Sequence, residues 1–452
     1  MARRFKTPDY EATLNETITI GDCLPPDHLA RFVVQIIREL DLGEIYGHYG
    51  PVGGEPIAPQ ILLGLLFYGY ATGVFSSRKI EKATYESIPF RFIAGGLHPD
   101  HDTIANFRKK FLSEIKDLFV QILVIARERG KLDLGNISLD GTKVHADASK
   151  SHAVSYKRVL ELKTHLQMDV EELFALSESE ESLPQGLDPE QEIELRQKKL
   201  ADLVRAEQIL ESRARERYEA ELEEYEQKVR QRRERAAREG HKPRGREPKR
   251  PVAGPQNKDQ FNFTDPDSRI MKNSNNSGFD QHYNAQVAVD QQSFLIISNT
   301  ISNHPTDRHE AIPTLGAIPE EAGKPKAVAL DNGYFSTNNI SDIKDLGVEP
   351  YIATGREPHH RSWKDFFSSD QPTPPAEDAS PMVKMAYSLK TEIGRAIYRL
   401  RKCTVEPVIG IIKETLGFRQ FSLRGHEGVS GEWVLVCIAF DIKRLHALLT
   451  GW

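Results

Sequence analysis

Residues 150–258 constrain the fold of this 452-residue chain most strongly, because they cannot supply a globular core. The stretch is dense in Glu, Lys and Arg and poor in aromatic residues. Within residues 190–238, apolar positions such as Leu195, Leu203 and Leu222 recur in a pattern typical of a helical hairpin or a coiled-coil arm. Any sheet in this protein must therefore be assembled from segments on both sides of this insertion.

The end of the insertion is strongly basic. Residues 228–250 contain eleven Lys or Arg and three Glu, a net charge of +8. Such a run can bind a DNA backbone through the release of counterions, but it can equally be a solvated helix face. The segment after Gly240 is rich in Pro and Gly, which predicts a disordered linker.

Composition and charge narrow the classes of protein. The chain has 60 Lys and Arg against 66 Asp and Glu, a net charge of −6, so any surface that binds nucleic acid must be local. The three cysteines are scattered, which argues for a reducing compartment without disulfides. Residues 61–70 form the most apolar run, too short to cross a bilayer, and the basic first residues lack the apolar run of a signal peptide. We expect a cytoplasmic protein without membrane contact.

The N-terminal part of the chain predicts helices. Residues 26–40 have apolar positions at helical spacing, and residues 59–70 are almost wholly apolar, which predicts a buried helix. Residues 102–129 predict the longest helix of this part, and its beginning is similar to the second half of a helix-turn-helix. The basic residues on it are candidate DNA contacts: Arg108, Lys109 and Lys110.

Strand-like segments flank the insertion. Residues 136–146 precede it, residues 284–290 and 294–301 follow it as a hairpin, and residues 326–330 and 348–353 alternate with helical segments. Without the insertion, the order is three strands, helix, strand, helix, strand and then helices. This order predicts an α/β fold with a ribonuclease H-like core, in which the first and fourth strands lie side by side.

These patterns predict four parts of the chain. We expect an N-terminal helical domain, an α/β core in two pieces, an inserted charged arm with its basic linker, and a C-terminal helix. The corresponding residues are 1–130, then 131–149 with 259–425, then 150–258, and finally 426–452.

Three acidic residues stand at the ends of predicted elements. Asp140 and Asp331 each end an apolar strand-like run, and Glu406 directly precedes Pro407. Because proline fits the first turn of a helix, the helix is predicted to start near Thr404 or to kink there, which puts Glu406 in a first turn. Taken singly, each acid is also explained as a turn residue or a solvated helix start.

Taken together, the acids predict a catalytic site. Open α/β sheets bind their ligands at the carboxyl ends of strands, where Asp140 and Asp331 are expected. Three converging carboxylates need divalent cations to be tolerable, so the pattern indicates phosphodiester chemistry with two Mg²⁺ or Mn²⁺ ions.

Four ordered blocks resemble the catalytic blocks of bacterial insertion-sequence DDE transposases of the IS4/IS5-like kind. The blocks are residues 136–150, 280–290, 326–336 and 398–414. Residues 59–111 are similar to the N-terminal helical domain of that family, so the resemblance covers nearly all the chain outside the insertion. It implies that the metal ligands and catalytic residues are Asp140, Asp331 and Glu406.

The family also carries a Tyr-Arg-Glu-Lys signature around the third acid. Tyr398, Arg401, Glu406 and Lys413 would fill it here, although the interval from Arg to Glu is one residue longer than usual, so Lys402 could take the Arg role. The resemblance implies that Lys413 contacts a phosphate at the transposon end.

The activity that follows from this resemblance is DNA transposition. The protein is expected to bind terminal inverted repeats, cleave the transposon ends and join the 3′-OH to target DNA, as a dimer or larger oligomer. The alternatives are a ribonuclease H-like nuclease that cuts without joining and a non-catalytic DNA-binding protein derived from a transposase.

Overall fold

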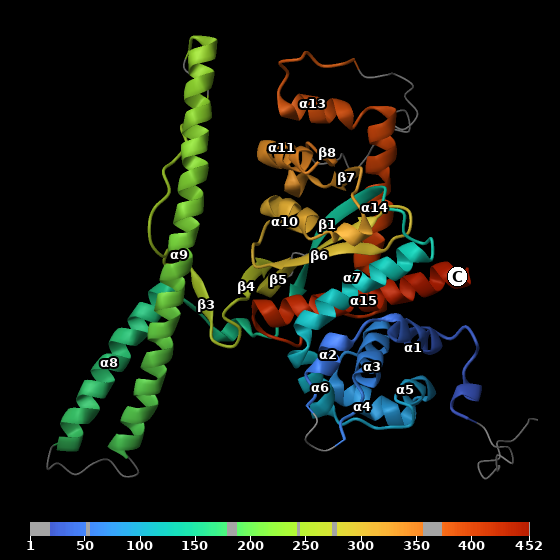
Figure 1. The fold of residues 1–452 in the computed structure, drawn as a ribbon. Helices are drawn as coiled ribbons and strands as arrows, with labels where there is room; N and C mark the ends of the chain where they lie inside the picture. Colours follow the sequence, from blue (N-terminus) through green and yellow to red (C-terminus); the bar gives the residue numbers. More distant parts are fainter. Residues whose placement is uncertain are drawn as a thin grey trace, which may run out of the picture. The chain divides into compact units, whose positions relative to one another are not determined.

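The computed structural model describes residues 19–50, 55–178, 188–241, 245–273, 278–355 and 373–451. The chain divides into two compact units (Figure 1). The first comprises the described residues of Met1–His145 and Tyr283–Trp452, and the second those of Ala146–His282. Among these residues, no helix combines the length and the apolar character needed to cross a membrane.

A mixed six-stranded sheet contains the five strands predicted from the sequence and one further strand, Arg269–Lys272, that the sequence interpretation missed. They are β1 (Asn136–His145), β4 (Arg269–Lys272), β5 (Phe279–Asp290), β6 (Ile296–Ser302), β7 (Ala327–Leu330) and β8 (Glu349–Ile352). The order is β5-β1-β7-β8, with β6 paired to the other side of β5, and β4 paired to the first residues of β5. The predicted mixed α/β class is confirmed.

The strand directions follow from the pairing. β5 and β6 form the predicted antiparallel hairpin, which contains a bulge between Ala288 and Val289. β1 and β5 are also antiparallel, since Gln291 N donates to Asn136 O at one end of the pair and Ala146 N donates to Gln281 O at the other. β7 is parallel to both β1 and β8, and all four of its residues are buried. Such wholly apolar strands are typical of parallel pairing with both faces covered.

Helices pack on the sheet from the second half of the chain. α14 contacts β1, β7 and β8, α15 and α10 contact β6, and α11 contacts β8 (Figure 1). Their bounds are α10 (Ala311–Gly316), α11 (Thr337–Asp345), α13 (Pro381–Ser388), α14 (Glu392–Gly410) and α15 (Gly425–Thr450). Residues 356–372 lie outside the described residues, and α13 begins at Pro381.

The N-terminal helices belong to the same compact unit as the sheet. They are α1 (Leu29–Glu39), α2 (Gly43–Gly47), α3 (Pro59–Ala71), α4 (Ser77–Glu86), α5 (Ile88–Ile93), α6 (His101–Lys110) and α7 (Leu112–Glu128). The apolar α3 packs against α15, as does α7. Because α3 and α7 pack against α15, the N-terminal helices are in the same compact unit as the sheet.

Two helix predictions in this part need correction. α1 begins at Leu29 rather than residue 26, because the His28 side chain accepts a hydrogen bond from Ala30 N and caps the helix. The single helix predicted over residues 102–129 is broken at Phe111, whose ψ of 29° ends α6. The Phe111 ring is buried, so packing overrides local helix propensity there.

Arg108 was predicted to contact DNA, and its burial corrects that prediction. Only 6% of its surface is exposed. Its Nη1 donates to Tyr70 Oη at 2.7 Å and lies 3.7 Å from Glu432 Oε1. Glu432 is fully buried on α15, where it also accepts from Tyr70 Oη and from Leu423 N. Arg108 therefore ties α6 to α3 and α15 in the interior.

α14 corrects the prediction for the third acid. The helix runs from Glu392 through Pro407 to Gly410 and continues as a π-helical turn, Ile411–Thr415. Glu406 is therefore near the end of a long helix, not in a first turn, so the partial positive charge of a helix start does not stabilise its carboxylate. Pro407 lacks an N–H, so the helix tolerates one missing hydrogen bond at this point.

The second unit contains the charged insertion. α8 (Tyr156–Glu178) and α9 (Pro189–Glu239) form a helical hairpin, one of the two forms expected. The ion pairs Lys163–Glu207 and Asp169–Arg196 join residues in opposite order, so the helices are antiparallel. A small apolar cluster between them comprises Val159, Leu203, Ala206, Leu210 and Phe261. The hairpin is joined to a two-stranded sheet of β2 (Ala153–Ser155) and β3 (Gln260–Asn262).

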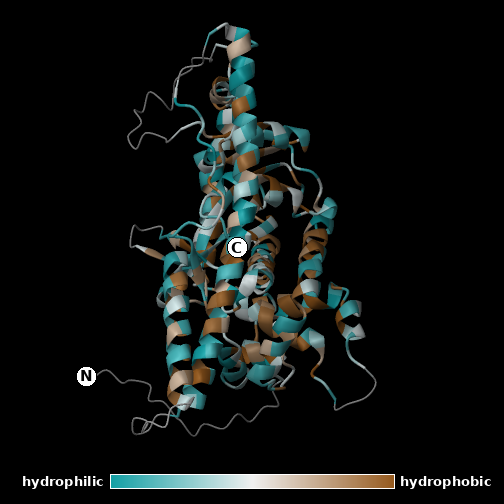
Figure 2. Ribbon diagram, turned by 90° about the vertical axis from the view of Figure 1, so that its left-hand side faces the viewer, coloured by the Kyte–Doolittle hydropathy of each residue, from teal (hydrophilic) through white to brown (hydrophobic). Residues whose placement is uncertain are grey.

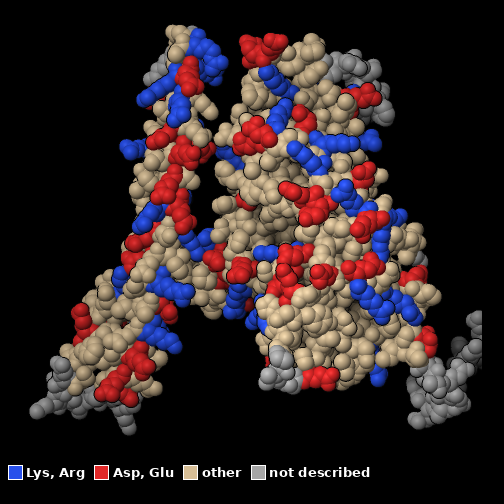
Figure 3. All heavy atoms as spheres, viewed as in Figure 1, with Lys and Arg blue, Asp and Glu red and all other residues tan. Residues whose placement is uncertain are grey.

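The surface of α9 is polar over most of its length (Figure 2). Figure 3 shows Lys and Arg interspersed with Asp and Glu along this helix. Residues 242–244 of the predicted disordered linker lie outside the described residues, but Gly245, Gly254 and Asp259 each contact α9. Arg232 donates to Gly245 O, and Arg217 pairs with Asp259 at 2.9 Å. The prediction of disorder is therefore wrong for residues 245–259, because α9 provides donors for their oxygen atoms.

Asp441 on α15 leads to the first prediction. Its Oδ1 accepts from Ile296 N at 2.8 Å, whereas its buried Oδ2 has no partner among the described residues. Burial raises the pKa of Asp441 well above its ordinary value of 3.8. The folded protein therefore holds a proton that the unfolded chain releases, and this contribution to stability is full below pH about 4 and lost as pH rises toward the folded-state pKa.

Asp441→Asn keeps the acceptor for Ile296 and removes the titration. We expect the melting temperature of the variant, relative to the parent, to increase steadily as pH is raised from 4 to 8. Thermal denaturation at several pH values measures this difference. A difference that is constant with pH would show that Asp441 is ionised in the folded protein.

Candidate active site

Asp140 and Asp331 lie on neighbouring parallel strands. The β1–β7 register pairs Asn136 with Ala327 and Ser138 with Ala329, and two further residues bring Asp140 level with Asp331. Asp331 directly follows β7, as predicted. Asp140 does not end its strand, because β1 continues to His145, where main-chain bonds to Arg419 and Phe421 hold it. Asp140 is therefore fixed within a strand, beyond the part that pairs with β7.

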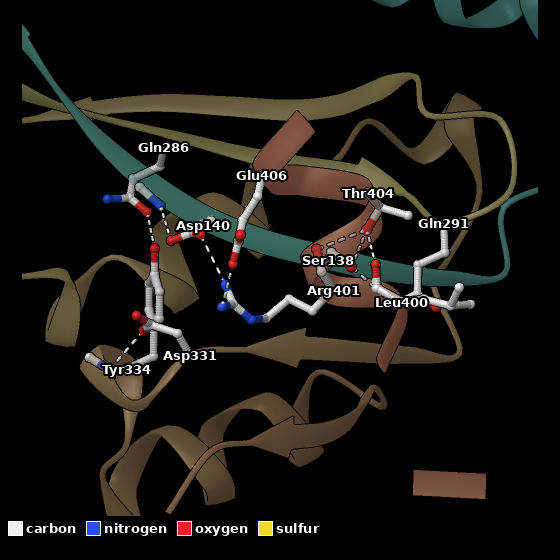
Figure 4. A network of polar contacts seen from close by, with 12 residues as sticks. Ser138, Asp140, Gln286, Gln291, Asp331, Tyr334, Leu400, Arg401, Thr404 and Glu406 are labelled. Carbon is white, nitrogen blue, oxygen red and sulfur yellow. Dashed lines mark hydrogen bonds and ion pairs between the residues drawn. The ribbon is translucent and has the colours of Figure 1, made fainter. Parts of the chain in front are cut away.

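Arg401 connects the first and third acids. Its Nη1 donates to Asp140 Oδ2 at 2.9 Å, and its Nη2 donates to Glu406 Oε1 at 2.9 Å (Figure 4). The Arg401 side chain is 8% exposed, whereas that of Glu406 is 47% exposed. One buried guanidinium thus holds a strand carboxylate and a helix carboxylate at a single point, and charge-assisted bonds of this kind are strong and directional.

The electrostatics of the site work against ionised carboxylates. Burial raises the pKa of Asp140 to about 6, the charges of Asp331 and Asp307 act in the same direction, and Arg401 opposes them. Burial also raises the pKa of Asp331, while the hydrogen bond from Gly333 N opposes the rise. Although burial disfavours its charge, Asp140 raises the pKa of Arg401, which stays protonated. The site carries an excess of acid that one arginine does not neutralise.

A buried group of hydrogen bonds around the Ser138 and Thr404 hydroxyls places Arg401 opposite Asp140. Thr404 Oγ1 lies 2.8 Å from Ser138 Oγ, and Gln291 Nε2 donates both to Ser138 Oγ and to Ile397 O at 3.0 Å (Figure 4). Ser138 precedes Asp140 by two residues, so both side chains lie on the same face of β1. These contacts join α14 to this face of β1 and to the end of β5. They therefore fix the position of Arg401 along β1.

A second network joins Asp307, which the sequence interpretation missed, to β5 and to Tyr334. Asp307, in the 3-10 helix η3 (Asp307–His309), accepts from Asn284 Nδ2 at 2.7 Å and from Gln286 Nε2 at 2.9 Å. Gln286 Oε1 accepts from the hydroxyl of Tyr334, which follows Asp331 by three residues (Figure 4). No local signal in the sequence separates Asp307 from an ordinary helix-capping residue.

The glycines after the two aspartates leave room for this network. A Cβ on Gly141 would clash with Gln286 Nε2 and lie 2.7 Å from Asp307 Oδ1. A Cβ on Gly333 would lie 2.9 Å from Asp331 Oδ1 and 3.6 Å from Asp307 Oδ2. Neither glycine has a positive φ. Close approach of polar side chains, rather than turn geometry, therefore requires glycine after Asp140 and after Asp331.

The remaining residues of the predicted signature differ in their burial and in their contacts. Tyr398 packs partly buried against Ala327, Ala329 and Tyr351, and Lys402 is exposed. Lys413 Nζ donates to Lys143 O at 2.8 Å, and burial lowers the pKa of Lys413. The structure thus attaches Lys413 to β1.

The two remaining lysines lie at the end of α6. Both Lys109 and Lys110 are exposed. The Nζ atom of Lys110 lies 5.0 Å from the centre of the Phe111 ring.

The donor set is suited to a hard divalent cation. All three predicted ligands are carboxylates, the type of ligand that Mg²⁺ and Mn²⁺ prefer. The Arg401 guanidinium already acts as a shared cation for Asp140 and Glu406. Within the described ranges, however, no three His, Cys, Asp or Glu side chains are grouped closely enough to hold a metal ion as they stand.

Fold and carboxylates together define a mixed α/β protein with an acidic site next to two parallel strands. Residues 18–110 match the family described as Transposase domain (DUF772), and residues 377–446 match the Transposase DDE domain. The resemblance to insertion-sequence DDE transposases is thereby confirmed. The second match includes Glu406 and Lys413 but neither aspartate. Comparison with curated proteins and with solved structures gave no significant match.

Proposed function

We propose that this protein is a DNA transposase that cleaves the ends of its element and joins the 3′-OH to target DNA. The observation that carries this proposal is the Arg401 bridge, because it brings acids from β1 and α14 to one point beside Asp331. The strand order, with an antiparallel meander followed by two parallel strands, supports a ribonuclease H-like core. The two transposase-domain matches support the same activity.

In this proposal, Asp140, Asp331 and Glu406 hold two divalent cations. When bound, such ions supply the chemistry of nucleophile activation and of charge stabilisation at the leaving oxygen. The protein residues orient the carboxylates. The Ser138–Thr404 contact holds α14 against β1, and Arg401 holds Glu406 facing Asp140. Asp140 must lose its proton to act as a ligand, so cation binding should weaken as pH falls through about 6.

DNA recognition is proposed for exposed cations on several elements. Lys109, Lys110 and Lys402 are exposed and suited to phosphate contacts, whereas Arg108 is not available. Lys413 would reach a transposon-end phosphate only by leaving its bond to Lys143 O. The basic run 228–250 on the arm is a further candidate, because its net charge of +8 favours the release of counterions from DNA.

Arg401 rather than Lys402 is proposed to complete the family signature. Arg401→Ala should slow cleavage of end DNA by about 10–100-fold, as expected when a group that orients metal-binding carboxylates is lost. Arg401 lowers the pKa of Asp140, so its removal should also move the acid limb of the rate profile to higher pH. Initial rates across pH measure both effects.

The matched control is Lys402→Ala, the exposed neighbour on the same helix. We expect it to leave the pH profile unchanged and to alter DNA binding only. If Lys402→Ala reproduced the loss of rate and Arg401→Ala did not, the assignment would have to be reversed.

The proposed function is tested by cleavage of the DNA that flanks the gene of this protein. Purified full-length chain with Mg²⁺ should cut at the terminal inverted repeats, and EDTA should stop the reaction. Equal cutting of unrelated DNA would favour the alternative of a ribonuclease H-like nuclease. Binding to the repeats with no cutting in either Mg²⁺ or Mn²⁺ would favour a non-catalytic DNA-binding protein.

A further inference from the structure

Asp307 lies close enough to both aspartates of the site to act on them electrostatically, but it belongs to neither of their segments. One of its oxygens, Oδ1, accepts from Asn284 Nδ2 and Gln286 Nε2. The other, Oδ2, lies 3.6 Å from the Cβ position of Gly333, a point that is 2.9 Å from Asp331 Oδ1. Asp307 Oδ1 is also 2.7 Å from the Cβ position of Gly141, next to Asp140.

The partners of Gln286 fix the orientation of its amide. Burial and the neighbouring acids raise the pKa of the Tyr334 phenol well above its ordinary value, so its hydroxyl donates to Gln286 Oε1. The Nε2 group must then face an acceptor, and the Asp307 carboxylate is that acceptor. A neutral amide at position 307 would retain one oxygen acceptor and lose the charge.

A main-chain connection reinforces the same geometry. The buried Asn339 side chain donates to Arg308 O at 2.8 Å and to Tyr334 O at 2.7 Å. It therefore joins the segment that carries Asp307 to the 3-10 helix η5 (Asn332–Tyr334) that follows Asp331. Asp307 is held at a defined place relative to Asp331 by two independent sets of contacts.

We propose that Asp307 is a fourth functional acid of this site, a positioning residue that orients Gln286 and Tyr334 and supplies a fixed negative charge beside Asp140 and Asp331. This inference rests on the proposed function, since the charge assists the binding of the divalent cations at those aspartates. Acidic partners around a metal site commonly change metal affinity without contacting the metal.

The test is the affinity of the full-length protein for Mn²⁺ without DNA, measured by titration calorimetry. Asp307→Asn keeps the size and one acceptor oxygen of the side chain, and we expect it to weaken Mn²⁺ binding by about 10–100-fold with little change in melting temperature. Asn284→Ala removes a donor but keeps the charge of Asp307. It should lower the melting temperature while leaving Mn²⁺ affinity close to that of the parent.

The outcomes separate this inference from the proposed function. Unchanged Mn²⁺ affinity in Asp307→Asn overturns the role of Asp307, provided that Asp140→Asn abolishes binding. If Asp140→Asn also binds Mn²⁺ normally, the proposed function itself fails. Asp307→Ser provides a second neutral variant in case Asp307→Asn does not fold, and the same loss of affinity is expected.

Discussion

Asp140→Asn should reduce cleavage of end DNA by about 10³-fold or more while leaving the protein folded. The loss is large because Asp140 is at the centre of the site. Arg401 bonds to it, and Asp331 lies level with it on the neighbouring strand. Removing a single electrostatic stabiliser of a transition state costs about 10²–10³-fold by itself. Loss of a cation ligand adds to this, since the remaining acids then hold the cations less tightly.

Folding should survive the substitution. Burial already raises the pKa of Asp140 to about 6, so the charged carboxylate is not favoured by its surroundings and a neutral amide is tolerated. Thermal denaturation and initial cleavage rates on the same preparation separate the two effects. Glu414→Gln is the control, because Glu414 is an exposed acid, eight residues after Glu406, that pairs with Arg419 on the surface. Equal rates for Asp140→Asn and the parent would refute the assignment of Asp140.

Arg108→Met should lower the free energy of unfolding by about 3–5 kcal/mol, the usual cost of leaving one member of a buried ion pair without its partner. Arg108 reaches Glu432 directly and through the Tyr70 hydroxyl, and both charged groups are shielded from water. Methionine fills a similar length without a charge. Chemical denaturation measures the change.

The interior role of Arg108 is distinguished from a DNA contact by two controls. Lys109→Met, at the exposed neighbour, should change stability by no more than about 0.5 kcal/mol. Arg108→Met combined with Glu432→Gln should recover part of the loss, because the uncompensated charge is then gone. Normal stability of Arg108→Met together with weaker binding of end DNA would restore the prediction made from the sequence.

The strands were predictable because their signals are local and redundant. β7 is a short apolar run between polar segments, and the β5–β6 hairpin has two apolar runs around a polar turn. Their order then placed Asp140 and Asp331 on adjacent strands, and the parallel register agrees with that placement. Here the topology followed from chain order alone.

The site contains features that no local signal in the sequence reveals. Asp140-Gly141 is typical of a turn, yet Gly141 lies within β1, where the requirement is space for Gln286 and Asp307. Glu406-Pro407 is typical of a helix start, yet α14 passes through it, because tertiary packing of Val405 and Val408 outweighs one missing hydrogen bond. Burial of Arg108 likewise depends on α15, which is far away in sequence. In each of these cases the prediction was wrong because a contact with residues distant in the sequence decides the role of the residue.

Strand transfer from pre-cut ends tests the central claim most directly. Duplexes that end in the 3′-OH of the terminal repeat, incubated with the full-length protein, Mg²⁺ and a target plasmid, should give covalently joined products. The account predicts that Asp140→Asn, Asp331→Asn and Glu406→Gln each abolish joining while still binding the repeat. Joined products at the parental level from any of these three variants would contradict it.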